Sequence, residues 1–220
     1  MVAMILSQRS RLNIVVLAAG FSSRLGQSKP LARLHGTRLL RRTLEVLVQV
    51  TSRRITVVVP PRAALLRAVL RGRQVTVLNN FARAGGLSTS VVLALRKAPY
   101  SGATLFLPAD LPQLTPRDVW RLVTRWQGQR RRVVARGVAG RATTPLILPN
   151  CLYARARELR GDVGLRDLIL TLPADDRILL DLPSAAIDVD TPQDLAAARR
   201  HFGAASRWRR PIPKDRTSSR

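Results

Sequence analysis

The chain has 220 residues, a hydrophobic content of 46% and a formal net charge of +25. This length can bury the core of one α/β domain, and no apolar run approaches the roughly 18 to 20 residues that span a bilayer, which excludes a membrane-spanning protein. The single cysteine, Cys151, excludes an intramolecular disulfide, and the opening MVAMILSQRSR lacks the order of a secretory signal, so we expect a cytoplasmic protein.

The positive charge raises a non-enzyme alternative, an arginine-rich nucleic-acid or polyanion binder, because clustered basic side chains neutralise phosphates. Residues 203–220 hold six basic side chains and one aspartate, a net of +5, so +20 of the total +25 is spread over the rest of the chain. An aromatic content of 4% leaves few platforms on which single strands could stack. The distribution argues against nucleic acid and indicates a surface that attracts small anionic substrates.

Apolar runs alternate with segments of helical periodicity along the chain. We predict strands near residues 13–18, 55–60, 75–78, 104–108, 133–136, 146–148 and 178–182. This alternation is typical of βαβ units and predicts a single Rossmann-like α/β domain with a mainly parallel central sheet flanked by helices. We place that domain at residues 1–202. The basic tail, residues 203–220, combines Gly, Ser, Pro and charge and is predicted to be disordered.

Helical spacing and capping residues indicate several helices between these strands. One face of the first predicted helix carries Leu40, Leu44, Leu47 and Val48, and a shorter one carries Leu65, Leu66, Val69 and Leu70. The tetrapeptides TPRD at 115–118 and TPQD at 191–194 each place threonine at the N-cap, proline at the first helical position and aspartate at the third. Both tetrapeptides predict the start of a helix.

The segment LAAGFSSRLGQSKP, residues 17–30, follows the first predicted strand and is the most informative part of the chain. Gly20 and Gly26 let the backbone turn or approach a ligand closely, so that its N–H groups could surround an anion. Arg24 and Lys29 add cations suited to a phosphate chain. The spacing excludes the dinucleotide fingerprint and the Walker A loop. The segment predicts a nucleotide substrate; the alternative is a Gly–Ser turn with solvated charges.

Few carboxylates are available to hold a divalent cation. Glu45, on a predicted helix, is the only acidic residue before Asp110, which follows the fourth predicted strand. Because ligands bind beyond the carboxyl ends of strands in an open α/β sheet, we expect the loop of Gly20 to meet Asp110. Asp188 and Asp190 directly precede a helix start and could supply a second carboxylate. The alternative for all three aspartates is a polar residue in a turn or at an edge.

The run LAAGFSSRLGQSK resembles the signature of the nucleotidyltransferases that attach a nucleotide to molybdopterin, the MobA-like NTP transferase family, with Leu25 in place of the usual methionine. Similar segments continue the resemblance over roughly residues 12–200: NNFARAGGLSTS at 79–90, PADLP at 108–112, TP at 144–145, GDVG at 161–164 and DVDTPQDL at 188–195. The resemblance implies a nucleotidyltransferase domain within residues 1–202.

The resemblance further implies Mg²⁺-dependent transfer of a CMP group from CTP to a molybdopterin-type cofactor, with release of pyrophosphate. Ala19 favours CTP, because relatives that transfer guanylate carry glycine at this position. The alternatives within the enzyme class are a guanylyltransferase for the same cofactor and a sugar-phosphate nucleotidyltransferase. The implied partners are molybdenum hydroxylase apoenzymes or their maturation factors.

Roles for individual residues also follow from the resemblance. It implies catalytic roles for Arg24, Lys29 and Asp110, and a metal held by Asp110 and Asp190, with Asp188 as the alternative. The implied nucleotide-binding residues are Leu17, Ala18, Ala19, Gly20, Ser22, Ser23, Gly26, Asn79, Gly86 and Ser90.

The chain departs from the family pattern N-x-x-W-x-x-G-x-x-x-S, since residues 79–90 contain no tryptophan and Phe81 is the nearest aromatic. It also has Thr-Thr-Pro at 143–145 where many relatives have Gly-His-Pro beside the acceptor. We interpret Asp162 of the GDVG turn as a helix cap rather than a catalytic group.

Overall fold

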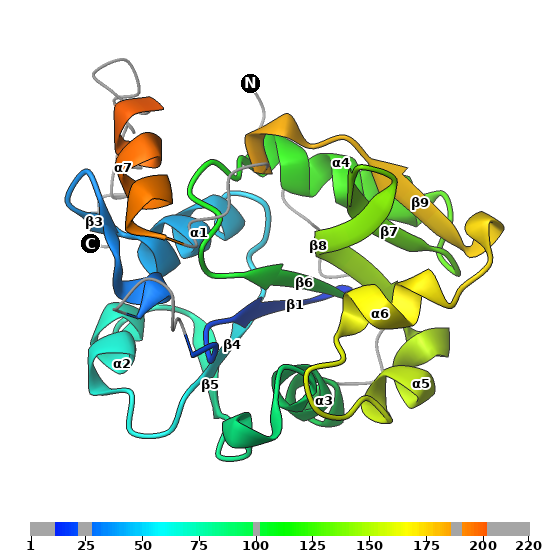
Figure 1. Ribbon diagram of the computed structural model, residues 1–220, viewed down its shortest axis with the longest axis horizontal. Coiled ribbons are helices and arrows are strands. Elements are labelled where there is room, and N and C mark those ends of the chain that lie inside the picture. The colour runs from blue at the N-terminus through cyan, green and yellow to red at the C-terminus, as the bar shows by residue number, and fades with distance from the viewer. Residues whose placement is uncertain (1–11, 22–27, 99–101, 186–190, 202–220) are drawn as a thin grey trace, which may run out of the picture.

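The computed structural model describes residues 12–21, 28–98, 102–185 and 191–201. A seven-stranded sheet forms its centre, and helices cover both faces of this sheet (Figure 1). The predicted α/β class is therefore confirmed. Residues 202–220 lie outside the described part, so the division into a domain and a tail stays a prediction.

All seven predicted strands are present in the central sheet. Their order is β5 (Val75–Asn79), β4 (Ile55–Val59), β1 (Leu12–Leu17), β6 (Ala103–Pro108), β8 (Arg141–Pro149), β7 (Val133–Val138) and β9 (Arg177–Leu180). Every neighbouring pair is parallel except the two pairs that include β8, so only this strand of the sheet runs in the opposite direction. The sheet is mainly parallel, as predicted.

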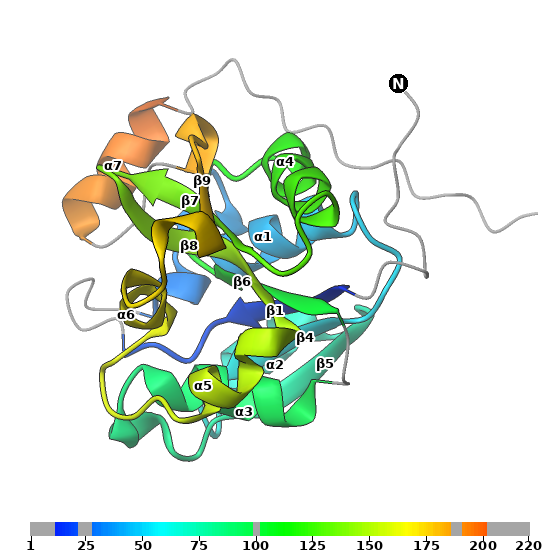
Figure 2. The ribbon, with the colours of Figure 1, turned by 90° about the vertical axis from the view of Figure 1, so that its right-hand side faces the viewer.

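Helices divide between the two faces of the sheet. On one face lie α1 (Leu39–Leu47), α2 (Ala64–Leu70) and α4 (Pro116–Gln127), and on the other lie α3 (Ser88–Lys97), α5 (Tyr153–Arg157) and α6 (Leu165–Leu170). Figure 2 shows α4 above the sheet and α3 and α5 below it. Because both faces are covered, the central strands are continuous apolar runs, and the first five residues of β6 are all buried. No helix in the described part of the chain is long and apolar enough to cross a bilayer.

The predicted apolar faces of α1 and α2 are only partly correct. Leu40, Leu44 and Leu47 are buried beneath α1, as expected. Val48 is exposed because the helix ends at Leu47 and Val48 is its C-cap. Leu65 is exposed as well, since its neighbour Leu66 occupies the inward position of this short helix.

Both predicted helix starts are confirmed. Helix α4 begins at Pro116, and its N-cap Thr115 forms a reciprocal capping box with Asp118, whose Oδ2 accepts the Thr115 N–H at 2.9 Å. Helix α7 (Pro192–His201) begins in the same way, with the Thr191 N–H donating to Oδ2 of Asp194 at 2.8 Å. In each helix the cap satisfies backbone N–H groups that have no partner inside the helix.

A small hairpin between the nucleotide segment and α1 was not predicted. It consists of β2 (Arg33–Leu34) and β3 (Thr37–Arg38), joined by His35 and Gly36, both of which have positive φ. Two consecutive positive φ values are typical of a tight hairpin turn. Helix α7 lies beside the hairpin, where Leu195 and Ala198 pack against Leu34 in a separate apolar cluster (Figure 1).

Candidate active site

The candidate site lies beyond the carboxyl ends of β1 and β6. These strands are parallel neighbours, and the register pairs Leu17 with Pro108, the last residue of each strand. The chain proceeds from β1 to β4 and β5 on one side and then returns to form β6 on the other. Ligands bind at such a topological switch point in open α/β sheets. The structure thus places the segments that begin with Gly20 and Asp110 at a common edge of the sheet, as the sequence predicts.

Lys29 and Asp110 face each other at this edge. The Lys29 ammonium lies 3.7 Å from Oδ2 of Asp110, and each side chain is 18% exposed. Lys29 opens the short helix η2 (Lys29–Leu31), which the buried Pro30 anchors, while Asp110 follows β6. A cation and a carboxylate therefore lie close together and partly exposed, so that phosphate oxygens could reach the first and a bound cation the second.

Helix α1 supports the turn that carries Asp110. The Thr43 hydroxyl lies 3.4 Å from the Ala109 carbonyl oxygen, to which it donates, and Arg42 Nη2 donates to the Pro112 carbonyl at 3.5 Å. Burial lowers the pKa of Arg42, and the nearby carboxylate of Glu45 partly offsets this effect. The Ala109 N–H in turn donates to the Leu17 carbonyl at 3.1 Å, which joins the ends of β6 and β1. Asp110 is thus held by contacts on both sides of the turn.

A pocket of about 150 Å³ lies next to this edge, and we call it the nucleotide pocket. Its lining residues are Leu17, Ala19, Gly20, Phe21, Arg83, Gly86, Leu87, Ser90 and Asp162. Five of them were predicted to bind nucleotide: Leu17, Ala19, Gly20, Gly86 and Ser90. Ala18, also predicted, does not line the pocket; it is buried in the core of the opposite sheet face, and its N–H donates to the Val58 carbonyl at 2.8 Å.

Gly86 is required by a close backbone approach. Its φ is +97°, and a Cβ at this position would lie 2.3 Å from the Gly161 carbonyl carbon. The turn at Gly161 is further tied to the start of α3, since the Ser88 hydroxyl donates to the Gly161 carbonyl at 2.8 Å. Oδ1 of Asp162 accepts the Leu87 N–H at 3.3 Å. The helix-cap interpretation of Asp162 is therefore not borne out: α6, the helix that follows, is capped through Gly164 and Asp167, and Asp162 instead ties the GDVG turn to Leu87, the residue before α3.

Asn80 is a residue of this region that the sequence interpretation missed. The predicted Asn79 ends β5 and accepts a hydrogen bond of 2.6 Å from Arg67, away from the pocket lining. Asn80 is buried, and its Nδ2 donates to the hydroxyls of Thr89 and Ser90, each at 2.9 Å. The signal was present in the sequence, because the family spacing counted back from Gly86 and Ser90 begins at Asn80.

Arg83 was missed for a similar reason. The same spacing places it where relatives carry tryptophan. The structure shows Arg83 in the lining of the nucleotide pocket, with its guanidinium carbon 4.0 Å from the centroid of the Phe21 ring. Phe81, the nearest aromatic in the sequence, is instead 78% exposed. Arg83 therefore contributes a planar side chain to the pocket lining, as Phe21 does.

Several predicted residues lie outside the described part of the chain: Ser22, Ser23, Arg24, Gly26, Asp188 and Asp190. Within that part, no group of three or more His, Cys, Asp or Glu side chains could hold a metal. Mg²⁺ does not require such a group, because it is commonly bound by one or two carboxylates together with water and substrate phosphates. The partly exposed carboxylate of Asp110 fits this donor set.

Comparisons with known proteins agree with this geometry. A sequence model of the MobA-like NTP transferase domain matches residues 14–176. The structure is similar to Rv0371c from Mycobacterium tuberculosis H37Rv, with a TM-score of 0.71 and 25% identity over 87% of this chain and 98% of that one. Rv0371c has also been solved as a manganese complex, which matches at a TM-score of 0.66 and 24% identity over 86% and 98% of the two chains.

Two further solved structures show the same fold. The homologue of Rv0371c from Mycobacterium sp. strain JC1 has a TM-score of 0.69 and 27% identity over 88% of this chain and 99% of its own. Molybdopterin-guanine dinucleotide biosynthesis protein A from Archaeoglobus fulgidus has a TM-score of 0.65 and 16% identity over 86% and 97% of the two chains. No curated protein matches the sequence. Because the domain match covers well over half of the chain, this protein belongs to the MobA-like NTP transferase family.

Proposed function

We propose that this protein is a Mg²⁺-dependent nucleotidyltransferase that transfers the CMP group of CTP to a molybdopterin-type cofactor. The observation that carries the proposal is the Lys29–Asp110 pair at the β1–β6 switch point, next to a small pocket that contains Ala19. The pair offers a cation for the phosphates and a carboxylate for a metal, and the pocket offers a place for the base.

The reaction would proceed by in-line attack of an acceptor phosphate oxygen on the α-phosphorus of CTP, with pyrophosphate as the leaving group. No nucleophile from the chain is needed, so the protein contributes positioning and charge stabilisation. Lys29 would bind phosphate oxygens, as would Arg24 and the backbone N–H groups that follow Gly20. Asp110, together with Asp190 or Asp188, would hold Mg²⁺. When bound, this ion neutralises phosphate charge and orients the leaving group.

The choice of CTP rests on the lining of the nucleotide pocket, which includes Ala19 and Ser90. The buried methyl group of Ala19 occupies space that glycine leaves open in relatives that transfer guanylate. The hydroxyl of Ser90, oriented by Asn80, gives the pocket a fixed polar group.

The acceptor would lie on the side of Asp110 that faces β8, the strand next to β6 in the sheet. Thr143 and Thr144 of β8 occupy the positions where many relatives border the acceptor, although the histidine of those relatives is absent. The product would be the cytosine dinucleotide form of the cofactor. Molybdenum hydroxylase apoenzymes, or their maturation factors, would receive this product in the cytoplasm.

A direct assay tests the proposal. The protein is incubated with molybdopterin, MgCl₂ and each of the four common NTPs in turn, and pyrophosphate release is measured. We expect release to be fastest with CTP. A preference for GTP would establish the guanylyltransferase alternative. Turnover with a sugar 1-phosphate, but not with molybdopterin, would establish the sugar-phosphate alternative.

The non-enzyme alternative is favoured by one observation, the net charge of +25. An arginine-rich polyanion binder would bind DNA tightly, with a steep dependence on salt that persists in an Asp110→Asn variant. We expect only weak binding of a labelled 20-base-pair DNA, measured by fluorescence anisotropy in about 0.15 M salt, where the Debye length is about 8 Å. Tight binding without pyrophosphate release would favour the binder.

A further inference from the structure

Arg83 and Phe21 connect two segments that border the nucleotide pocket. Phe21 follows Gly20 after β1, and Arg83 opens the short helix η3 (Arg83–Gly85) between β5 and α3. The Arg83 guanidinium stacks on the Phe21 ring at 4.0 Å, and its Nη2 lies 3.4 Å from the Gly20 carbonyl oxygen, to which it donates. One arginine therefore contacts two consecutive residues of the nucleotide segment.

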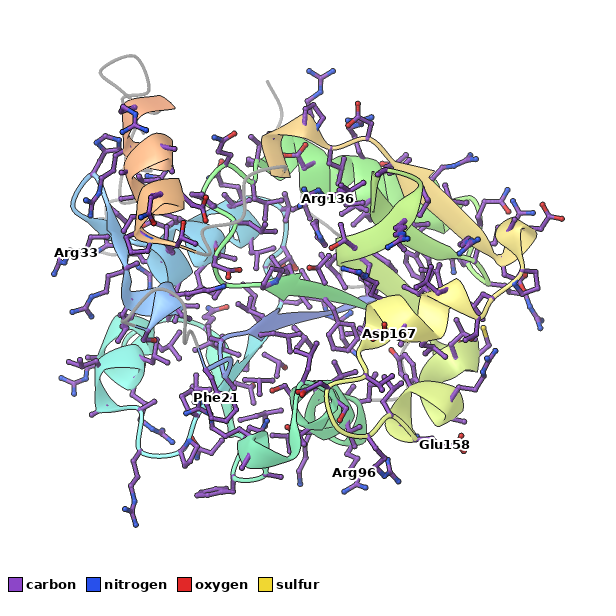
Figure 3. The ribbon with its side chains drawn as sticks, in the orientation of Figure 1. Phe21, Arg33, Arg96, Arg136, Glu158 and Asp167 are labelled. Carbon is purple, nitrogen blue, oxygen red and sulfur yellow. The ribbon has the colours of Figure 1, made fainter. Side chains whose placement is uncertain are left out.

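Within the described residues, the core gives Gly20 and Phe21 little cover. Phe21 is 62% exposed, so the core does not hold its ring (Figure 3). A Cβ built on Gly20 would meet no described atom within 4 Å. Arg83, by contrast, contacts both residues of this turn.

The Arg83 guanidinium combines stacking on Phe21 with one hydrogen bond to Gly20. Its Nε is buried and has no hydrogen-bond partner among the described residues. An unsatisfied buried donor is unfavourable, and the planar guanidinium stacked on an aromatic ring offsets part of that cost. Lysine could not reproduce this arrangement, because its ammonium is compact and not planar.

We infer that Arg83 is a positioning residue, which holds Gly20 and Phe21 at the mouth of the nucleotide pocket and thereby sets the affinity for the nucleoside triphosphate. The inference rests on the proposed function and deepens it. Arg83 acts through Phe21 and Gly20, whereas Lys29 and Asp110 act on the phosphates and the metal. Loss of Arg83 should therefore weaken nucleotide binding without slowing the chemical step.

The test compares Arg83→Ala, Phe21→Leu and the double variant. Their Kd for CTP is measured by calorimetry in MgCl₂, and the KM for CTP and kcat are measured by pyrophosphate release. We expect each single variant to raise Kd and KM by about 2- to 30-fold, the range of a cation–π contact, with kcat unchanged. The double variant should be no weaker than the weaker single variant, since both remove the same contact.

Matched controls exist for both side chains. Arg96→Ala removes an equal charge from the exposed last turn of α3, where Figure 3 shows the side chain at the lower edge of the molecule. Phe81→Leu removes a ring that is 78% exposed, against 62% for Phe21, and that does not line the pocket. Neither control should change the Kd for CTP. Because Phe21 is largely exposed, Phe21→Leu keeps the test valid if Arg83→Ala fails to fold.

Three results would overturn the inference while the unaltered protein still converts CTP. The first is an unchanged Kd in both single variants. The second is a pair of single effects that multiply in the double variant. The third is full recovery of CTP affinity in Arg83→Lys, which would show that charge rather than the stacked plane matters. If the unaltered protein neither binds nor converts any NTP, the proposed function fails, and this inference fails with it.

Discussion

The ammonium group of Lys29 lies 3.7 Å from Oδ2 of Asp110, and neither residue is more than partly exposed. Asp110 follows β6, which the Ala109–Leu17 hydrogen bond joins to β1, and Lys29 is placed by helix η2, whose Pro30 is buried. Substitution of either residue changes the charge that the other experiences. This relationship makes the pair a sensitive point at which to test the proposed chemistry.

Asp110→Asn should abolish most of the turnover and leave the fold intact. The substitution keeps the size of the side chain but removes the charge proposed to hold Mg²⁺, so we expect kcat to fall by about 10²- to 10³-fold. Asp175→Asn, on the exposed helix η5 (Ala174–Asp176), is the matched control and should retain full activity. A fall of less than about threefold for Asp110→Asn, below 1 kcal/mol in activation free energy, would contradict the metal assignment.

Ala19→Gly should shift the base preference from CTP toward GTP. Removal of the methyl group enlarges the nucleotide pocket, and a methyl-sized change in a pocket alters discrimination by about tenfold or more. Competition between CTP and GTP in the pyrophosphate assay measures the ratio of their kcat/KM values. Ala18→Gly removes the same group from the neighbouring core position and should leave the ratio unchanged. Equal effects of the two variants would show that Ala19 does not select the base.

Gly86→Ala should be more destabilising than Gly72→Ala. Both glycines have positive φ, +97° and +74°, but only Gly86 would bring its Cβ against the Gly161 backbone. We expect Gly72→Ala to cost about 1 to 2 kcal/mol for the backbone conformation alone, and Gly86→Ala a further 1 to 3 kcal/mol or so for the clash. Urea unfolding measures both free energies. Equal losses in the free energy of unfolding would show that the Gly161 backbone can move away from the new Cβ without further destabilising the protein.

Asp118→Ala should cost more stability than Asp167→Ala, although both residues occupy the same position in a helix cap. Asp118 is buried, and in addition to the cap the Ser184 hydroxyl, 2.8 and 2.7 Å from its two carboxylate oxygens, shares its single proton between them. Exposed Asp167 accepts only the Gly164 N–H, at 2.7 Å, among the contacts described for it. We expect a loss of about 2 to 4 kcal/mol in the free energy of unfolding for Asp118→Ala and about 1 kcal/mol for Asp167→Ala. Similar losses in urea unfolding would show that the Ser184 contact contributes little.

Much of the fold could be predicted because local signals agreed with the final structure. The apolar runs of β1, β4 and β6 are unambiguous, since central parallel strands are buried on both faces. The Thr-Pro-x-Asp sequences at the starts of α4 and α7 are equally clear, because a helix start has few chemical solutions.

The reversed direction of β8 could not be predicted in this way. An apolar run reads the same in either direction, and the polar residues 141–144 resembled a loop rather than the first half of a strand. The direction is set by the tight turn at Ala139 and Gly140, both with positive φ, which returns the chain immediately beside β7. Alanine at the first of these positions gives little indication of such a turn.

The candidate site was predicted where its residues belong to the glycine-rich segment or follow a strand, as Lys29 and Asp110 do. Asn80 was missed because the family spacing was counted from the first of two adjacent asparagines instead of back from Gly86 and Ser90. The same count would have singled out Arg83, which otherwise does not stand out among 38 basic residues. Its role depends on Phe21, more than sixty positions away in the sequence, which only the folded chain brings into contact.

The reversal of β8 has a consequence for how this enzyme class can diversify. Since the register pairs Phe106 with Leu146, residues 141–143 and the turn before them project past the end of β6. None of the residues that line the nucleotide pocket comes from this hairpin. Under the proposed function, insertions or exchanges at its tip would therefore change the acceptor side of the site without altering the residues that line the nucleotide pocket.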